Sequence, residues 1–153
     1  MDKAELVVKL LFSKGLKIAT AESCTGGMLA EKITSVGGAS SCFGIGVITY
    51  SNESKVKILG VSENTLSQFG AVSEQTAREM AAGIKKLSKA DIAVSITGIA
   101  GPDGGTIDKP VGLVYVGINN EVFRLRLDGD RENIRNKTVD FVLDKVYNAF
   151  EGD

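Results

Sequence analysis

The stretch that decides the fold is Ile92-Ala93-Val94-Ser95-Ile96-Thr97, which runs directly into the loop Gly98-Ile99-Ala100-Gly101-Pro102-Asp103-Gly104-Gly105. A largely apolar run of this length that leads into glycines is typical of a strand buried on both faces of an α/β sheet. The glycines let backbone approach a ligand and offer N–H groups to an anion. The loop matches neither the P-loop nor the dinucleotide-binding GxGxxG pattern, so a structural turn explains it equally well.

Strand and helix patterns alternate on both sides of this stretch. A glycine turn over 22–27 joins a strand expected over 16–21 to a helix expected over 28–33. Further strands are expected over 45–50, 113–118 and 122–127, the last two forming an antiparallel hairpin through Asn119-Asn120. Further helices are expected after Asp2, over 55–59, after Ser62, after Ser73 and after Asp130. The clearest helix is the one that opens at Ser73-Glu74, because one of its faces carries Ala77, Met80, Ala81, Ile84 and Leu87.

This order of elements predicts one domain over residues 1–153, an α/β fold built as a single three-layer α/β/α sandwich with a mixed, mainly parallel sheet. In such sheets ligands bind outside the carboxyl ends of the strands. The loops at Ser23, Tyr50 and Gly98 are therefore expected to share one site.

Composition narrows the classes of function. The 153 residues include no histidine and only two cysteines, which excludes Ser-His-Asp catalysis and His-ligated or thiolate zinc, so we expect neither metal nor cofactor. Lys and Arg total 18 against 19 Asp and Glu, so no basic field would attract nucleic acid or an anionic membrane. With no apolar run near the roughly 20 residues of a membrane span and an acidic start, we expect a cytoplasmic protein. As a partner we expect further copies of the chain in a homo-oligomer.

Two neighbouring side chains are candidate nucleophiles. Ser23 lies between a strand and Thr25-Gly26-Gly27, at the start of a helix where free N–H groups and the helix dipole favour an anion or oxyanion. A plain N-cap is the competing interpretation of this serine. Cys24 is the rival nucleophile, since a helix start lowers a thiol pKa, but a small buried side chain explains it as well.

Lys55 is the candidate base. A lysine in a partly desolvated pocket loses its proton more readily, and Ser with Lys is a known replacement for Ser with His. Lys55 and Tyr50 flank the polar turn over 51–54, while Lys57 should point another way on the helix. A solvated surface lysine is the alternative for Lys55.

Arg131 follows Gly129-Asp130 in the first turn of the last helix, where its charge opposes the helix dipole. That position hints at an anion to pair with. Arg124 and Arg126, which alternate with apolar residues, are expected to form a solvated strand face.

Taken together, five blocks resemble the CinA C-terminal domain family across almost the whole chain: 21–27 (AESCTGG), 49–55 (TYSNESK), 70–73 (GAVS), 97–105 (TGIAGPDGG) with 109–112 (KPVG), and 129–131 (GDR). The resemblance implies nicotinamide-nucleotide amidase activity, in which the carboxamide of nicotinamide mononucleotide is hydrolysed to nicotinic acid mononucleotide and ammonia. On this resemblance, the chain is similar to the stand-alone form of the family. By position, the family's serine nucleophile falls on Ser23, its lysine on Lys55 and its tyrosine on Tyr50.

The same resemblance, with the glycine-loop argument, suggests a set of substrate-binding positions. Thr97 stands where some relatives have serine, and Arg131 with a glycine loop would hold the nucleotide phosphate. The full set of expected substrate-binding residues is Thr25, Gly26, Gly27, Thr97, Gly98, Gly101 and Arg131.

Two alternatives stay open at this point. One is a module that binds a pyridine nucleotide without turning it over, although a pure binder has no need of a nucleophile and a base together. The other is a competence- or damage-associated accessory to nucleic acid, for which the sequence offers neither a basic patch nor an aromatic platform. The preferred nucleotide and the loop that binds phosphate are open as well.

Overall fold

A computed structural model describes residues 1–152 and contains one five-stranded sheet of order β2-β1-β3-β4-β5. The strands are β1 (Ile18–Glu22), β2 (Phe43–Ile48), β3 (Ile92–Gly98), β4 (Leu113–Ile118) and β5 (Glu121–Arg126). β1 pairs in parallel with β2 and β3, whereas β4 is antiparallel to both β3 and β5. Four of the five strands therefore run in one direction, which confirms the mixed, mainly parallel sheet.

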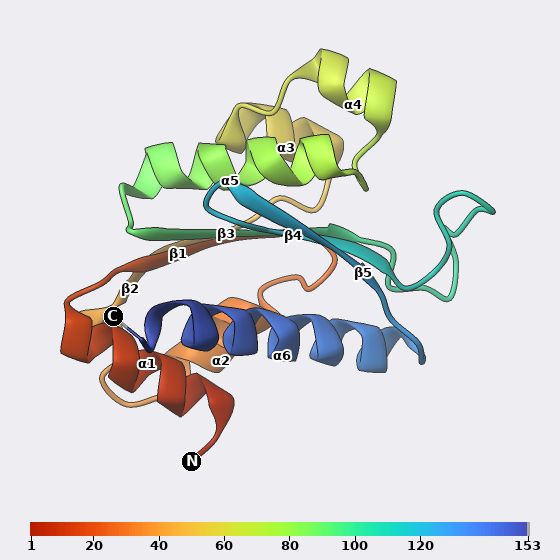
Figure 1. The fold of residues 1–153 in the computed structure, drawn as a ribbon. Helices are drawn as coiled ribbons and strands as arrows, with labels where there is room; N and C mark the ends of the chain where they lie inside the picture. The colour runs from red at the N-terminus through yellow and green to blue at the C-terminus, as the bar shows by residue number, and fades with distance from the viewer. Residues whose placement is uncertain (153) are drawn as a thin grey trace.

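Helices cover both faces of this sheet (Figure 1). On one side lie α3 (Asn52–Leu59), α4 (Glu63–Phe69) and α5 (Glu74–Ser88), with α5 directly against the central strands. On the other side lie α1 (Lys3–Lys14), α2 (Met28–Thr34) and α6 (Arg131–Phe150), and a 3-10 turn η1 (Ala39–Ser41) follows α2. The expected three-layer sandwich is confirmed.

Local capping signals explain where most helices begin. The side chains of Asp2, Ser62 and Ser73 accept hydrogen bonds from backbone N–H groups in the first turns of α1, α4 and α5. Asp130 forms a full capping box with Asn133 at the start of α6. Gly15 ends α1 in the left-handed conformation that glycine adopts without strain.

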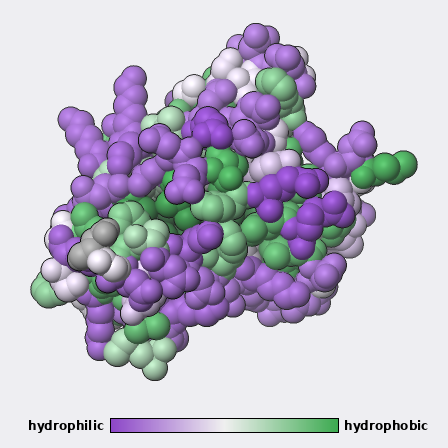
Figure 2. Space-filling view, in the orientation of Figure 1, coloured by the Kyte–Doolittle hydropathy of each residue, from purple (hydrophilic) through white to green (hydrophobic). Residues whose placement is uncertain are grey.

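Two apolar clusters hold the layers together. The larger joins the sheet to α1, α2 and α6, and the smaller lies under α5, where Met80 and Ile84 are fully buried. Figure 2 shows apolar side chains reaching the surface mainly between the two helical layers, while hydrophilic ones cover the helices. Leu87 does not belong to the buried face of α5 as predicted, because it lies in the last turn and is 50% exposed.

The predicted strand limits shifted by one or two residues at several places. β1 includes Glu22, and β2 ends at Ile48, so Tyr50 lies beyond the strand and not in it. The hairpin through Asn119 is confirmed, with Asn119 at φ 54°. Arg124 and Arg126 are exposed on β5, as expected. Within residues 1–152, none of the helices combines the length and apolar character that a bilayer span requires.

Candidate active site

The carboxyl ends of β1, β2 and β3 meet around one cavity of about 260 Å³. β2 and β3 lie on opposite sides of β1, and the crevice formed at such a reversal is the usual ligand position in open α/β sheets. Of the expected site residues, the lining includes Ser23, Tyr50, Lys55, Thr97, Gly98, Gly101 and Arg131. The three loops expected to share a site are thus brought together.

Lys55 is a buried amine inside this cavity. Its side chain is only 1% exposed, although it lies in the first half of the short helix α3, whose N-cap is Ser51. Its Nζ donates hydrogen bonds to Ser23 Oγ at 3.1 Å and to the carbonyl oxygens of Thr49 at 2.8 Å and Tyr50 at 3.5 Å. Burial without a carboxylate partner lowers the pKa of this amine from its ordinary value of 10.5. The surface-lysine interpretation is therefore wrong for Lys55, whereas Lys57 is exposed and lines a separate groove between α3 and α4.

Ser23 faces this amine and is not a helix cap. Helix α2 starts at Met28 with Gly27 as its N-cap, so the hydroxyl four residues earlier has no capping role. The backbone of Ser23 is fixed on both sides, because its N–H donates to Ile96 O at 2.9 Å and its carbonyl accepts from Gly26 N at 3.0 Å. The side chain is 8% exposed. The result is a serine hydroxyl held beside a lysine amine in a largely water-free setting.

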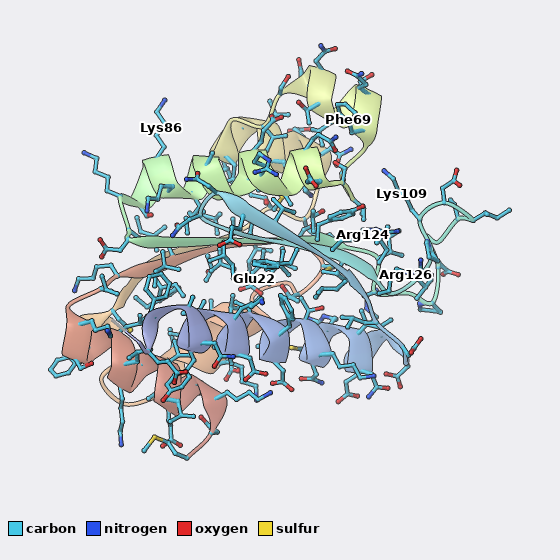
Figure 3. All side chains as sticks on the ribbon, viewed as in Figure 1. Glu22, Phe69, Lys86, Lys109, Arg124 and Arg126 are labelled. Atoms are coloured by element: carbon cyan, nitrogen blue, oxygen red, sulfur yellow. The ribbon has the colours of Figure 1, made fainter. Side chains whose placement is uncertain are left out.

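Glu22 occupies the amino end of α2 that sequence analysis left open for an anion. Its buried carboxylate accepts hydrogen bonds from Leu29 N and Ala30 N, each at 3.0 Å, and from Thr25 Oγ1 at 2.6 Å. Figure 3 shows Glu22 beneath the sheet, on the side of α6. Because the protein's own carboxylate uses these donors, they are not available to a substrate phosphate.

Thr25, Gly26 and Gly27 are consequently not part of the cavity lining. The Thr25 hydroxyl is engaged by Glu22, and the Gly26 N–H donates to the Ser23 carbonyl. Gly26 and Gly27 have φ of 58° and 103°, which other residues adopt only with strain. Their contribution in the structure is to shape the turn that carries Ser23.

Cys24 lines the same cavity but its thiol is poorly suited to attack. Burial raises the pKa of the Cys24 thiol to about 11, and this effect exceeds the lowering by a backbone hydrogen bond and by Arg135 and Arg131. A thiol with this pKa carries almost no thiolate near neutral pH. Of the two interpretations of Cys24, the small buried side chain fits the structure, because the helix begins at Met28 and the thiol is buried.

Tyr50 and Arg131 form one unit at the mouth of the cavity. Arg131 is the first residue of α6, and its guanidinium donates to Tyr50 Oη at 2.9 Å and to the Gly101 carbonyl at 2.8 Å. Tyr50 is 59% exposed, so its ring is available to a ligand. The anion inferred from the position of Arg131 is replaced in this structure by two neutral acceptors.

Thr97 and Gly98 end β3 at the wall of the cavity. The Thr97 hydroxyl donates to Ala71 O at 2.8 Å and ties the strand to the loop before α5. A Cβ on Gly98 would lie 2.6 Å from Val114 Cγ2 and 2.9 Å from the Leu113 carbonyl, so only glycine fits there. Both residues position the wall, and Thr97 Oγ1 already has a partner.

Sequence reasoning missed several residues that build this site. Arg135 lies one turn after Arg131 in α6. It donates to the carbonyls of Cys24 at 3.1 Å and Thr25 at 3.0 Å, so a residue distant in sequence holds the turn that carries Ser23. The sequence pattern places Glu22 only in the glycine turn, although a carboxylate at the end of a buried strand itself indicates a position with a specific role. Asp103 also lines the cavity.

The sequence profile of the CinA C-terminal domain matches residues 1–150. The chain belongs to the CinA C-terminal domain family. It is 58% identical over 149 residues to a CinA-like protein of Kosmotoga olearia, a match that covers 95% of this chain and 36% of that protein. The chain thus spans about a third of the length of such curated relatives.

Solved CinA structures share the whole fold. A CinA superfamily protein from Klebsiella pneumoniae superimposes with a TM-score of 0.93 at 35% identity, covering 100% of both chains. The competence/damage inducible protein CihA of Agrobacterium tumefaciens superimposes with a TM-score of 0.87 at 41% identity over 95% of this chain and 94% of that one. The predicted family and fold are therefore confirmed.

Proposed function

We propose that this CinA-family domain is an amidase that hydrolyses the carboxamide of nicotinamide mononucleotide to nicotinic acid mononucleotide and ammonia, with Ser23 as nucleophile and Lys55 as base. The observation that carries the proposal is the contact of 3.1 Å between Lys55 Nζ and Ser23 Oγ, made by an amine that is 1% exposed. A nucleophile and base within hydrogen-bond reach are the minimum that covalent amide hydrolysis needs.

Hydrogen bonding around Lys55 supports the role of base. A neutral amine has two N–H groups and one lone pair. The carbonyls of Thr49 and Tyr50 accept from Nζ, so in the neutral form the two N–H groups are used and the lone pair is left for the Ser23 hydroxyl. Desolvation favours this neutral form.

The proposed reaction balances with these two groups and water alone. As Ser23 Oγ bonds to the carboxamide carbon, its proton passes to Lys55 Nζ, and the resulting ammonium gives a proton to the amide nitrogen, which leaves as ammonia. Water then attacks the Ser23 ester and passes one proton through Lys55 to Ser23 as the ester bond breaks. The carboxylic acid that leaves gives its remaining proton to ammonia or solvent and becomes the carboxylate. Backbone N–H groups at the cavity wall would stabilise each tetrahedral oxyanion.

Tyr50 and Arg131 would position the nucleotide. They lie at the cavity mouth, and Arg131 is the fixed cation there that a phosphate would approach. Binding energy from the phosphate then orients the carboxamide, so nicotinamide mononucleotide should be a better substrate than free nicotinamide.

Ammonia release from nicotinamide mononucleotide tests the proposal directly. The purified chain should release ammonia with and without EDTA, and Ser23→Ala should lose several orders of magnitude in kcat, as removal of an essential nucleophile does elsewhere. A wild-type chain that binds the nucleotide without releasing ammonia would make it a binding module. Substantial turnover by Ser23→Ala would remove the serine from its role.

A further inference from the structure

The charges that line the cavity are unevenly partnered. Lys55 is a buried amine whose pKa is lowered, and Arg131 donates to the Gly101 carbonyl and Tyr50 Oη. Asp103 is the one acidic residue in the lining, and within residues 1–152 its carboxylate has no hydrogen bond or ion pair. Arg131, on the same cavity, is thus occupied by neutral acceptors while a carboxylate nearby is unpaired.

The backbone that carries Asp103 is the stem of the loop between β3 and β4, which projects beyond the sheet (Figure 1). The stem is tied by Gly112 N to Ile99 O at 2.8 Å, by Ile99 N to Leu113 O at 2.9 Å, and by Arg131 to Gly101. The fully exposed Ile107 marks the tip, and Lys109 near it reaches the Phe69 carbonyl (Figure 3). These ties end at Gly101, two residues before Asp103, whose exposed side chain lines the cavity.

An unpaired carboxylate beside a binding site repels anions and attracts cations. The nucleotide of the proposed function has both charges: a pyridinium ring that is positive because its nitrogen is bonded to ribose, and a negative phosphate. The cavity matches this pair with one carboxylate, Asp103, and one guanidinium, Arg131. The lining thus offers each charged end of the ligand a group of opposite charge.

We infer that Asp103 is a specificity-determining residue that recognises the positive charge of an N-substituted pyridinium ring, which directs the site toward nucleotides with such a ring and away from neutral nicotinamide. This inference rests on the proposed function for the identity of the ring. It assigns the ring charge to Asp103 and the phosphate to Arg131, the two charged groups that the lining offers beside the buried Lys55. Free nicotinamide and the reduced nucleotide, whose dihydronicotinamide ring is uncharged, lack the positive ring charge and gain nothing from the carboxylate.

Equilibrium binding separates ring charge from phosphate. Binding of 1-methylnicotinamide, which is cationic and has no phosphate, is compared with that of neutral nicotinamide by NMR titration at low salt, where exposed charges are least screened. The Ser23→Ala background prevents turnover. Asp103→Asn is the test variant, and Asp108→Asn, a change on the same loop outside the cavity lining, is the matched control.

We expect Asp103→Asn to weaken binding of 1-methylnicotinamide by about two- to fivefold, the range for an exposed charge pair, and to leave nicotinamide unchanged. Asp108→Asn should change neither. Equal affinities of the two probes for the parent protein, equal loss for both in Asp103→Asn, or no binding of either probe would overturn the inference. Absence of ammonia release by the wild-type chain, with the charge preference intact, would instead defeat the proposed amidase and leave the recognition of a cationic ring standing.

Discussion

Replacing the buried amine of Lys55 by the apolar side chain of methionine should change how stability depends on pH. Burial lowers the pKa of Lys55 in the folded protein, while the unfolded chain keeps the ordinary value of 10.5. Between these two values the unfolded chain binds more protons than the folded one, so the free energy of unfolding of the wild type rises with pH. Lys55→Met has no amine at this position, so its free energy of unfolding lacks this rise with pH.

The size of the effect follows from one proton. Within the window, the stability of the wild type should rise relative to Lys55→Met by about 1.4 kcal/mol per pH unit. For a domain of this size that corresponds to about 3 to 6 °C in the difference between the two Tm values per pH unit. Below the folded-state pKa the difference should be constant, with the wild type carrying the cost of a buried charge.

Urea denaturation of both proteins from about pH 6 to about pH 10 measures the difference. Lys57→Met is the control, because Lys57 is exposed on the same helix and stays solvated in both states. The stability difference should begin to rise at the folded-state pKa of Lys55. The specificity constant kcat/KM of the wild type should reach half of its maximum near the same pH, since the neutral amine is the proposed base. A stability difference between wild type and Lys55→Met that stays flat across this pH range would refute the lowered pKa. A rise in kcat/KM at a pH that differs from the onset of the stability change would separate Lys55 from the role of base.

Three further changes test other parts of the site. Cys24→Ser should keep most of the activity, because a thiol with a pKa of about 11 is not the nucleophile. A nearly inactive Cys24→Ser, together with a thiol-alkylating reagent that inactivates the wild type and not this variant, would make Cys24 the nucleophile in place of Ser23. Glu22→Gln should lower the free energy of unfolding by about 1 to 3 kcal/mol, since one amide oxygen replaces a carboxylate with three donors; an unchanged urea midpoint would contradict this. Arg131→Lys keeps the charge but loses the two-pronged contact to Tyr50 and Gly101, so kcat/KM for the nucleotide should fall more than that for free nicotinamide, and equal losses would give Arg131 a purely structural role.

Local patterns were enough to predict most of the fold. Caps such as Ser73 and Asp130, and the largely apolar run of β3, depend on residues close in sequence, and these elements formed where expected. Strand limits were less certain, as with Tyr50, because the end of a strand depends on its neighbours in the sheet. The family followed from five short blocks taken together.

The site could be predicted only in part, because its chemistry depends on contacts between distant segments. The spacing around Lys55 alone is that of a surface lysine, and its pairing with Ser23, 32 residues away, could be predicted only through the family resemblance. The pairing of Arg135 with Thr25 joins residues 110 apart. The amino end of α2 was predicted to hold an anion, and the anion proved to be Glu22, six residues before the helix starts.

The contacts between α6 and the turn that carries Ser23 have a consequence for the synthesis of the protein. Domains are synthesised from the amino terminus, and Ser23 leaves the ribosome long before Arg131 and Arg135 do. Until the last helix is complete, the carbonyls of Cys24 and Thr25 lack their guanidinium donor and Tyr50 lacks its partner. A nascent chain that stops short of α6 would carry both Ser23 and Lys55 and yet no finished site, so any hydrolytic capacity should appear only after the first turns of α6 have been made.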